Sequence, residues 1–283
     1  GKPFSLPRSA PHLLQKVLKS NKGQRITTTI NFELQQHSNA IVKKHYKLLK
    51  QNEIHNISVL ILDVDTREVL TYIGNSPTDK AHQKNVDVIN KPRSTGSILK
   101  PFLYAAMLDA GELLPQTLVA DVPTQFGSYQ PENFNLSYDG AVHANEALSR
   151  SLNVPAVRML QDFGLDRFYH YLKQLQLKDL KYNANHYGLS LILGGAESNL
   201  WDLCKSYAGM ASTLNHFNEH SSTYFTNEFV EPIYQKNKSV DFGTLQSETL
   251  VFNAASIYHT FESMKQLNRP ENDESWDIYN SSQ

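Results

Sequence analysis

The feature that most constrains the fold is the stretch from residue 97 to residue 110, which predicts a helix apolar on nearly every side. Such a helix is stable only when other elements surround it, so the chain must build a core around it. Pro101 is tolerated only in the first turn, which places Ser97 at the helix N-terminus, and Gly111 supplies a stop signal. Lys100 lies within this apolar helix and therefore needs a partner.

Length and charge limit the class of protein. The chain has 283 residues, of which 40% are hydrophobic, enough for one large domain or one domain with a smaller companion. The 27 Lys and Arg residues balance 28 Asp and Glu residues, which argues against a nucleic-acid partner. No stretch reaches the roughly eighteen apolar residues that span a bilayer. A single cysteine, Cys204, excludes an internal disulfide and a cysteine-cluster metal site.

Periodicity and turn residues predict the other elements. Residues 57–65 and 68–73 form strands that Thr66-Arg67 joins into a hairpin, and residues 25–30 form a short strand. Further helices are expected over residues 31–52, 145–150, 165–175, 197–212 and 246–267. Loops are expected over residues 74–92, 115–140 and 216–243. Early strands followed by helices predict the α+β class, with fewer strands than a complete sheet needs.

The Ser97-x-x-Lys100 spacing is the first candidate for catalysis. At i and i+3 the two side chains share one helix face. A serine hydroxyl is a poor nucleophile until a neighbour accepts its proton, and a lysine desolvated by an apolar helix can have a pKa low enough to do so. The helix N-terminus adds backbone N–H groups where an oxyanion would develop. The alternative is a chance spacing, since short motifs recur without function.

Ser151-x-Asn153 is the second candidate. Pro155 disfavours helix in the residue before it, so residues 151–154 are expected to leave the regular helix and Pro155 to begin another. Outside a helix, residues two apart can point the same way, and a hydroxyl beside an amide could relay a proton and hold a peptide group. The alternative is that Ser151 or Asn153 caps the helix that Pro155 begins.

Two other patterns name different chemistry. His216, Glu219 and His220 fit the H-x-x-E-H pattern of zinc hydrolases, in which the histidines bind zinc and the glutamate acts as base. That geometry needs a long helix, whereas this segment is predicted as a solvated loop, so a zinc hydrolase is a remote alternative. Gly194-Gly195 lacks the lysine and spacing of a phosphate loop and is interpreted as a tight turn between packed segments.

Several longer stretches carry a family resemblance: Arg93-Ser-Thr-Gly-Ser-Ile-Leu-Lys-Pro-Phe102, Tyr129-x-Pro-x-Asn133, Glu146-Ala-Leu-Ser-Arg-Ser-Leu-Asn-Val-Pro-Ala156 and Ser190-Leu-Ile-Leu-Gly-Gly-Ala196. Together they resemble the transpeptidase domain of penicillin-binding proteins, in particular bifunctional class A members of the 1C type. The resemblance implies a penicillin-binding, serine β-lactamase-like fold with a helical cluster and an incomplete antiparallel sheet. The prolines and Gly23 of the first residues indicate a linker over residues 1–24, and the resemblance implies a partial transpeptidase domain over residues 25–283.

The resemblance assigns a role to each candidate residue. Ser97 corresponds to the family's nucleophile and Lys100 to its general base. Ser151 corresponds to a proton relay or lysine partner, and Asn153 to a residue that binds the substrate's peptide amide. The implied reaction is acyl transfer from the D-alanyl-D-alanine end of a peptidoglycan stem peptide, which cross-links the wall. β-Lactam antibiotics would trap Ser97, and neither a metal nor an organic cofactor is implied.

The chain also departs from the family. No Lys-(Ser or Thr)-Gly triplet occurs in it, and the resemblance places that third motif shortly after a segment like residues 276–283. We therefore expect a fragment of a longer enzyme, impaired on its own. Its parent would carry a glycosyltransferase domain and a membrane anchor and act on the periplasmic face of the bacterial inner membrane. The alternative is a non-catalytic penicillin-binding-fold module that binds cell-wall synthesis partners.

Overall fold

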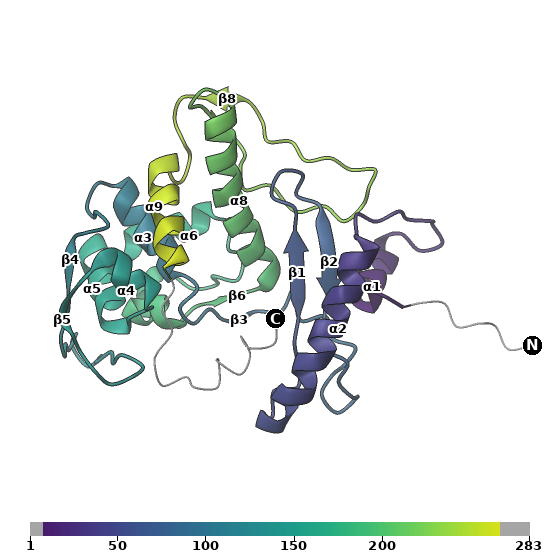
Figure 1. Cartoon of the computed structure of the whole chain (residues 1–283), viewed down its shortest axis with the longest axis horizontal. Coiled ribbons are helices and arrows are strands. Elements are labelled where there is room, and N and C mark those ends of the chain that lie inside the picture. The colour runs from purple at the N-terminus through teal and green to yellow at the C-terminus, as the bar shows by residue number, and fades with distance from the viewer. Residues whose placement is uncertain (1–7, 267–283) are drawn as a thin grey trace, which may run out of the picture. The chain divides into compact units, whose positions relative to one another are not determined.

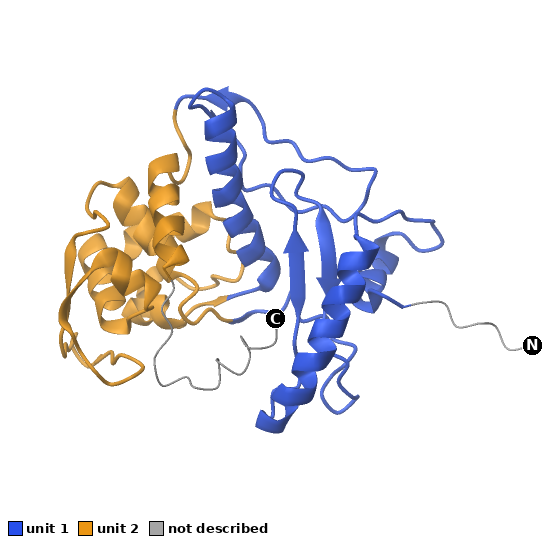
Figure 2. Ribbon diagram, in the orientation of Figure 1, with its two compact units in different colours: residues 1–93, 198–247 blue, residues 94–197, 248–283 orange. Residues whose placement is uncertain are grey.

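The computed structural model describes residues 8–266, which divide into two compact units (Figure 2). Unit 1 comprises residues 1–93 and 198–247, and unit 2 comprises residues 94–197 and 248–283. The chain thus leaves unit 1, builds most of unit 2, returns to complete unit 1 and ends in unit 2. The expected boundary between a linker and a domain at residue 24 stays a prediction.

Unit 1 is built around a hairpin (Figure 1). Its elements are α1 (Pro11–Ser20), α2 (Phe32–Leu49), the short 3₁₀ helix η1 (Lys50–Asn52), β1 (Val59–Leu62), β2 (Val69–Ile73), α8 (Leu200–Glu219), and the antiparallel pair β7 (Tyr224–Phe225) and β8 (Leu245–Gln246). Helices α1 and α2 pack on β2, and α8 packs on β1. The core comprises Leu13, Val17, Leu60, Val69, Tyr72, Ile89 and Trp201.

The predicted hairpin is confirmed. β1 and β2 run antiparallel with Leu60 opposite Tyr72, and the register shifts between Ile61 and Leu62. The predicted helix over residues 31–52 is also confirmed as α2 and η1, and the Asn31 side chain caps it by accepting a hydrogen bond from the Leu34 N–H. The strand predicted over residues 25–30 is wrong, because this segment has only one isolated bridge, at residue 28, and no continuous partner strand.

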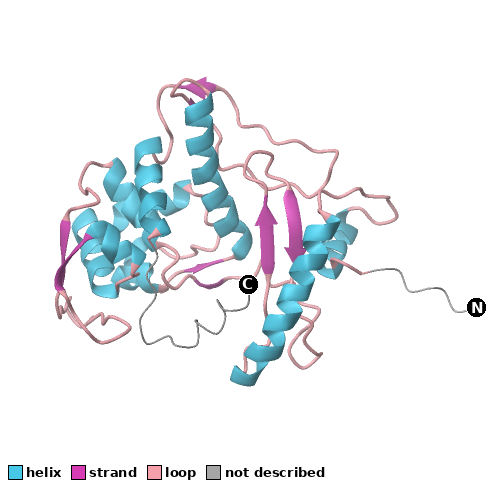
Figure 3. Cartoon of the chain, viewed as in Figure 1, coloured by secondary structure: helices cyan, strands magenta, loops and turns pink. Residues whose placement is uncertain are grey.

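Unit 2 is mostly helical (Figure 3). Its central helix is α3 (Lys100–Asp109), and every residue from Lys100 to Met107 is buried, as the apolar pattern predicted. Four helices pack against α3: α4 (Ala144–Ser149), α5 (Asn153–Phe163), α6 (Leu165–Gln174) and α9 (Ala254–Lys265). The unit also contains α7 (Ala184–Tyr187) and the 3₁₀ helix η2 (Gly188–Leu193). The helical cluster expected around the apolar helix is therefore confirmed.

The strands are short. In unit 2, β4 (Leu118–Asp121) pairs antiparallel with β5 (Gly140–His143), although residues 115–140, which include β4, were predicted as a loop. The remaining pair, β3 (Arg93–Ser94) with β6 (Glu197–Ser198), falls at the two boundaries between the units. Within residues 8–266 every sheet has two strands, which accords with the shortage of strands noted in the sequence.

Candidate active site

Ser97 lies in the turn that leads into α3. The helix begins at Lys100 rather than at Ser97, because residues 96–99 form a turn in which the Ile98 N–H donates to the Thr95 carbonyl at 3.1 Å. Pro101 occupies the first helical turn, as predicted. The Ser97 residue is exposed, and its hydroxyl makes no hydrogen bond to any residue that the structure describes. The hydroxyl is therefore open to an incoming molecule.

A second segment of unit 2 holds this turn in place. The Ser94 hydroxyl donates to the Gly194 carbonyl at 2.8 Å, and the Thr95 N–H donates to the Ala196 carbonyl at 3.1 Å. Gly194 has a φ of 101°, and a Cβ there would lie 2.5 Å from Ser94 Oγ and 2.7 Å from the Gly96 nitrogen. Only glycine fits both the conformation and the space. The interpretation of Gly194-Gly195 as a tight turn between packed segments agrees with this geometry.

Lys100 is 4% exposed and meets the second candidate pair inside unit 2. Its Nζ donates to Asn153 Oδ1 at 2.8 Å, to the carbonyl oxygens of Ser151 at 2.7 Å and Leu152 at 3.2 Å, and lies 3.2 Å from Ser151 Oγ. Burial lowers the pKa of the Lys100 amine to about 7. The structure thus brings Lys100, Ser151 and Asn153 together, and Ser97 stands three residues before Lys100 in the chain.

Ser151 reaches the amine because of the way α4 ends. The Ser151 N–H donates to the Leu148 carbonyl at 2.9 Å and the Leu152 N–H donates to the Ala147 carbonyl at 3.0 Å, the two bonds of a Schellman motif. The left-handed position of that motif, with a φ of 54°, is Ser151, where glycine is usual. This turn directs the carbonyl and the hydroxyl of Ser151 to the same amine.

Helix α5 starts earlier than the sequence predicted. It begins at Asn153, so Arg150, Ser151 and Leu152 are the residues between α4 and α5, and Pro155 lies in the first turn of α5 instead of opening it. Proline is tolerated there because the first-turn N–H groups have no partner within the helix. The Asn153 side chain remains on the side facing Lys100, and its Nδ2 donates to the Glu132 carbonyl at 2.8 Å. Both polar atoms of the Asn153 amide, Oδ1 and Nδ2, are therefore hydrogen-bonded.

A residue with no predicted role caps α5. The Asn133 Oδ1 accepts hydrogen bonds from the N–H groups of Asn153 at 3.0 Å and Val154 at 3.2 Å. Asn133 is 1% exposed, and its Nδ2 donates to Asp121 Oδ1 at 2.7 Å. The hypothesis that Ser151 or Asn153 caps this helix is therefore wrong. The only sequence signal for Asn133 was its place in the Tyr129-x-Pro-x-Asn133 stretch.

The H-x-x-E-H segment is not the solvated loop that the sequence predicted. Helix α8 continues to Glu219, and within it the Ser212 and Thr213 hydroxyls donate to the Gly209 carbonyl. His216 is 8% exposed, and its Nδ1 lies 2.9 Å from Glu228 Oε1. Residues 8–266 contain no group of three His, Cys, Asp or Glu side chains placed to hold a metal ion. The zinc alternative therefore lacks its ligand set within the described part of the chain.

Comparison with known proteins identifies the family. Residues 57–207, more than half of the chain, match the penicillin binding protein transpeptidase domain, so the chain belongs to that family. Penicillin-binding protein 1C from Escherichia coli strain K12 is 34% identical over 210 residues, which cover 74% of this chain and 27% of that protein. Penicillin-binding protein 1F from Bacillus subtilis strain 168 is 25% identical over 212 residues, covering 74% and 28%. The expected resemblance to class A proteins of the 1C type is confirmed.

The fold agrees with this assignment. The crystal structure of penicillin-binding protein 1A from Haemophilus influenzae superposes with a TM-score of 0.59 at 19% identity, covering 81% of this chain and 38% of that chain. The predicted α+β fold of the penicillin-binding type is thus confirmed. The chain spans about a quarter of the length of the two curated relatives named above. Within residues 8–266, no helix has both the length and the apolar character needed to cross a membrane.

Proposed function

We propose that this chain carries the acylation site of a peptidoglycan D,D-transpeptidase, with Ser97 as nucleophile and Lys100 as general base. The observation that most supports this proposal is the buried Lys100 amine, whose pKa is about 7. Lys100 lies three residues after Ser97, an exposed serine in the turn that leads into α3. With that pKa, about half of the amines are neutral at pH 7 and can accept a proton.

The first half-reaction forms an ester on Ser97. The Lys100 amine takes the hydroxyl proton as Ser97 Oγ attacks the carbonyl between two D-alanines of a stem peptide. The C–N bond then breaks, the leaving D-alanine amine takes up a proton, and the acyl group remains on Ser97. In the second half-reaction the amine of a neighbouring stem attacks this ester, forms the cross-link and returns the proton to Ser97. This chemistry uses side-chain and backbone groups alone, so we propose no metal and no organic cofactor.

The second pair has complementary roles in this proposal. When Lys100 is neutral, its amine can accept a hydrogen bond from the Ser151 hydroxyl 3.2 Å away, which makes Ser151 a relay for the proton to the leaving amine. Asn153 already holds Lys100 through Oδ1. Its amide offers both a donor and an acceptor, so it can bind a substrate peptide group if that group replaces the Glu132 carbonyl as the partner of Nδ2.

β-Lactam antibiotics would acylate the same serine, because opening the lactam amide leaves the departing nitrogen tethered to the ester. We propose that the parent protein carries a glycosyltransferase domain and a membrane anchor, and that it acts on peptidoglycan at the periplasmic face of the inner membrane. The 283 residues contain no Lys-(Ser or Thr)-Gly triplet. In the family this triplet lies on a strand that supplies one oxyanion donor, so this chain is expected to acylate about a hundred- to a thousandfold more slowly than a relative that has the triplet.

Release of D-alanine from an N-acylated D-alanyl-D-alanine peptide tests this function. We expect slow release by the chain, none by Ser97→Ala, and unchanged release by Ser128→Ala, because Ser128 is an exposed serine of unit 2 outside the site. Equal release by the chain and by Ser97→Ala would contradict the proposal. Absence of release from any form, together with absence of a β-lactam adduct, would favour the non-catalytic binding module.

A further inference from the structure

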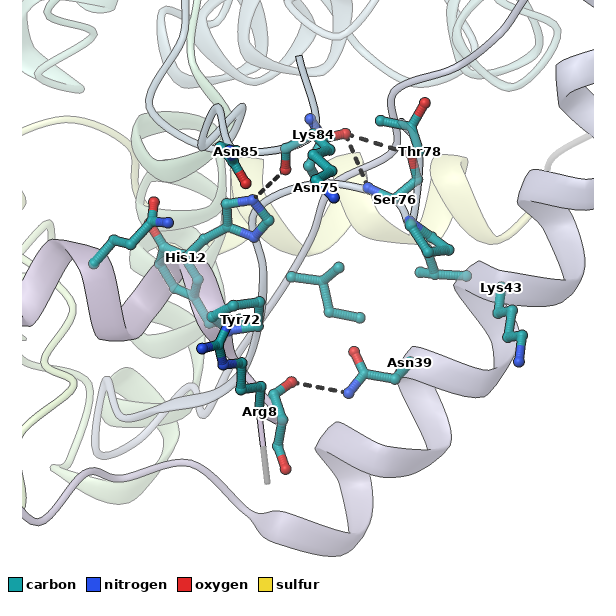
Figure 4. Close-up of a pocket in the computed structure, with 16 residues that line it drawn as sticks. Arg8, His12, Asn39, Lys43, Tyr72, Asn75, Ser76, Thr78, Lys84 and Asn85 are labelled. Carbon is teal, nitrogen blue, oxygen red and sulfur yellow. Dashed lines mark hydrogen bonds between the residues drawn. The ribbon is translucent and has the colours of Figure 1, made fainter. Parts of the chain in front are cut away.

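Unit 1 contains a cavity of about 550 Å³ that the acylation chemistry does not use (Figure 4). It is bounded by the N-terminal part of α1, one face of α2, the end of β2 and the loop of residues 74–85. All sixteen lining residues belong to unit 1, whereas Ser97 and Lys100 belong to unit 2. A cavity of this size can hold a small organic molecule.

Among the described residues, the lining of the cavity has positively charged side chains and no negatively charged ones. Arg8, Lys43 and Lys84 line the cavity, all three are exposed, and none of the sixteen described lining residues is acidic. Asp87 lies nearby in the chain, but its carboxylate accepts hydrogen bonds from the Tyr72 hydroxyl and the Ile89 N–H and is not part of the lining. The three cations form no ion pair with any residue that the structure describes. They therefore favour an anionic group at the mouth of the cavity.

The wall of the cavity contains a buried histidine with a free ring nitrogen. His12 is 7% exposed, and its Nε2 lies 2.9 Å from the Lys84 carbonyl oxygen. A carbonyl oxygen only accepts, so Nε2 carries the hydrogen and the neutral ring has its lone pair on Nδ1. Nδ1 has no hydrogen-bond partner among residues 8–266. Gly74 allows this placement, because a Cβ there would lie 2.5 Å from His12 Cβ.

Two neutral amides complete the set of unused polar groups. The side chains of Gln15 and Asn85 line the cavity and make no hydrogen bond to the described residues. Each amide can both donate and accept. Nδ1 of His12 can accept a hydrogen bond from a hydroxyl, and Asn85 lines the same cavity. The lining thus offers cations for an anion and mixed donors and acceptors for hydroxyl groups.

We propose that this cavity is a binding site for a hydroxylated anionic small molecule, namely a sugar that carries a carboxylate or a phosphate. The positive charges of Arg8, Lys43 and Lys84 around the mouth attract the anionic group. The hydroxyl groups bind His12 Nδ1 and the two amides. The site is separate from the acylation chemistry of unit 2 and holds whether or not Ser97 is a nucleophile.

Isothermal titration calorimetry on the whole chain at low ionic strength tests the site with D-glucuronate, D-glucose 6-phosphate, D-glucose and inorganic phosphate. We expect both sugar anions to bind and neutral glucose and inorganic phosphate to bind at least about tenfold more weakly. Lys43→Glu and Lys84→Glu should each weaken binding of the sugar anions by about tenfold or more, because each replaces an attraction by a repulsion. Lys44→Glu, the adjacent exposed lysine outside the lining, makes the same charge change and should weaken binding less than about twofold.

The other outcomes overturn the proposal in distinct ways. Equal binding of glucose would remove the role of the cations, and equal binding of inorganic phosphate would remove the role of the hydroxyl contacts. An equal loss of affinity for the sugar anions in Lys43→Glu and Lys44→Glu would show that binding depends on the overall charge and not on a specific site. Absence of heat with every probe up to about 10 mM would exclude the site altogether. Ser97→Ala should bind the sugar anions as the unchanged chain does, which separates this test from that of the acylation site.

Discussion

Ser151 contacts the Lys100 amine twice, through its carbonyl oxygen at 2.7 Å and its hydroxyl at 3.2 Å. The carbonyl contact depends on the left-handed backbone that ends α4, and the hydroxyl contact depends on the side chain. Serine in this left-handed conformation is less stable than glycine, which would adopt the same backbone without strain. Serine, however, places a hydroxyl beside the Lys100 amine. The two contributions can therefore be separated by substitution.

Ser151→Gly should stabilise the fold and impair the reaction. Removing Cβ relieves the left-handed strain, so the free energy of unfolding should rise by about 1 kcal/mol, measured by urea denaturation. Loss of the relay hydroxyl should slow acylation by labelled penicillin about a hundredfold. Ser151→Ala should slow acylation equally without the gain in stability. Full acylation by either variant would contradict a role for this hydroxyl.

The rate of acylation should rise with pH through about 7 and then level off. The base must be neutral, and burial sets the pKa of Lys100 at about 7, so the neutral fraction grows up to that pH and is nearly complete above it. A lysine with an ordinary pKa would give a rate that continues to rise toward pH 10. The measurement is the penicillin acylation rate between pH 5 and pH 9. Lys100→Met should show no acylation across this range, and residual acylation with the same pH profile would exclude Lys100 as the base.

Asn133→Ala should weaken both the fold and the site, although Asn133 is separated from Lys100 by Asn153. The substitution leaves two N–H groups at the start of α5 without their acceptor, which should cost about 1–3 kcal/mol in the free energy of unfolding. Asn153 is the first residue of α5 and its Oδ1 holds the Lys100 amine, so loss of this cap should also slow acylation. Asn135→Ala removes an exposed amide of the same loop that accepts only from the Ser137 N–H, and it should change both quantities little. Equal effects of the two substitutions would contradict the capping role.

Gly194→Ala should disturb the turn before Ser97. Its Cβ would meet Ser94 Oγ at 2.5 Å and the Gly96 nitrogen at 2.7 Å, in addition to the strain of a φ of 101°. We expect a loss of about 2 kcal/mol or more in the free energy of unfolding and a clear loss of acylation. Gly111→Ala is the matched control, because Gly111 also has a positive φ of 71° but no atom within 4 Å of its Cβ position. It should lose about 1 kcal/mol and acylate normally.

The elements that the sequence predicts correctly are those with a local signal. The apolar stretch after Ser97 and the position of Pro101 predicted a buried helix with a lysine inside it, and the turn at Thr66-Arg67 predicted the hairpin. The role of Asn133 depends on a hydrogen bond to Asn153, twenty residues further along the chain, and hydrophobic periodicity does not indicate such a contact. The strand β4 is four residues long in a segment rich in Pro, Gly and Asn, so turn signals outweighed it. Helix α8 was predicted too short because Ser212 and Thr213 satisfy their hydroxyls within the helix, which composition alone does not reveal.

The beginning of α9 also depends on a contact that local sequence signals do not predict. The sequence predicted a helix from residue 246, but α9 begins at Ala254, where the Asn253 side chain accepts a hydrogen bond from the Ser256 N–H. Residues 245–246 instead pair with β7, a contact that lies far away in sequence. The predicted helix end at residue 267, and residues 276–283 before the expected third motif, lie outside the described residues.

Peptide mapping by mass spectrometry after prolonged incubation with penicillin tests whether Ser97 is the nucleophile, because it locates the ester bond on one residue. We expect a single penicilloyl adduct on Ser97, absent from Ser97→Ala and from Lys100→Met and present in Ser128→Ala. An adduct on another serine, or an adduct on Ser97 that forms at the same rate in Lys100→Met, would contradict it.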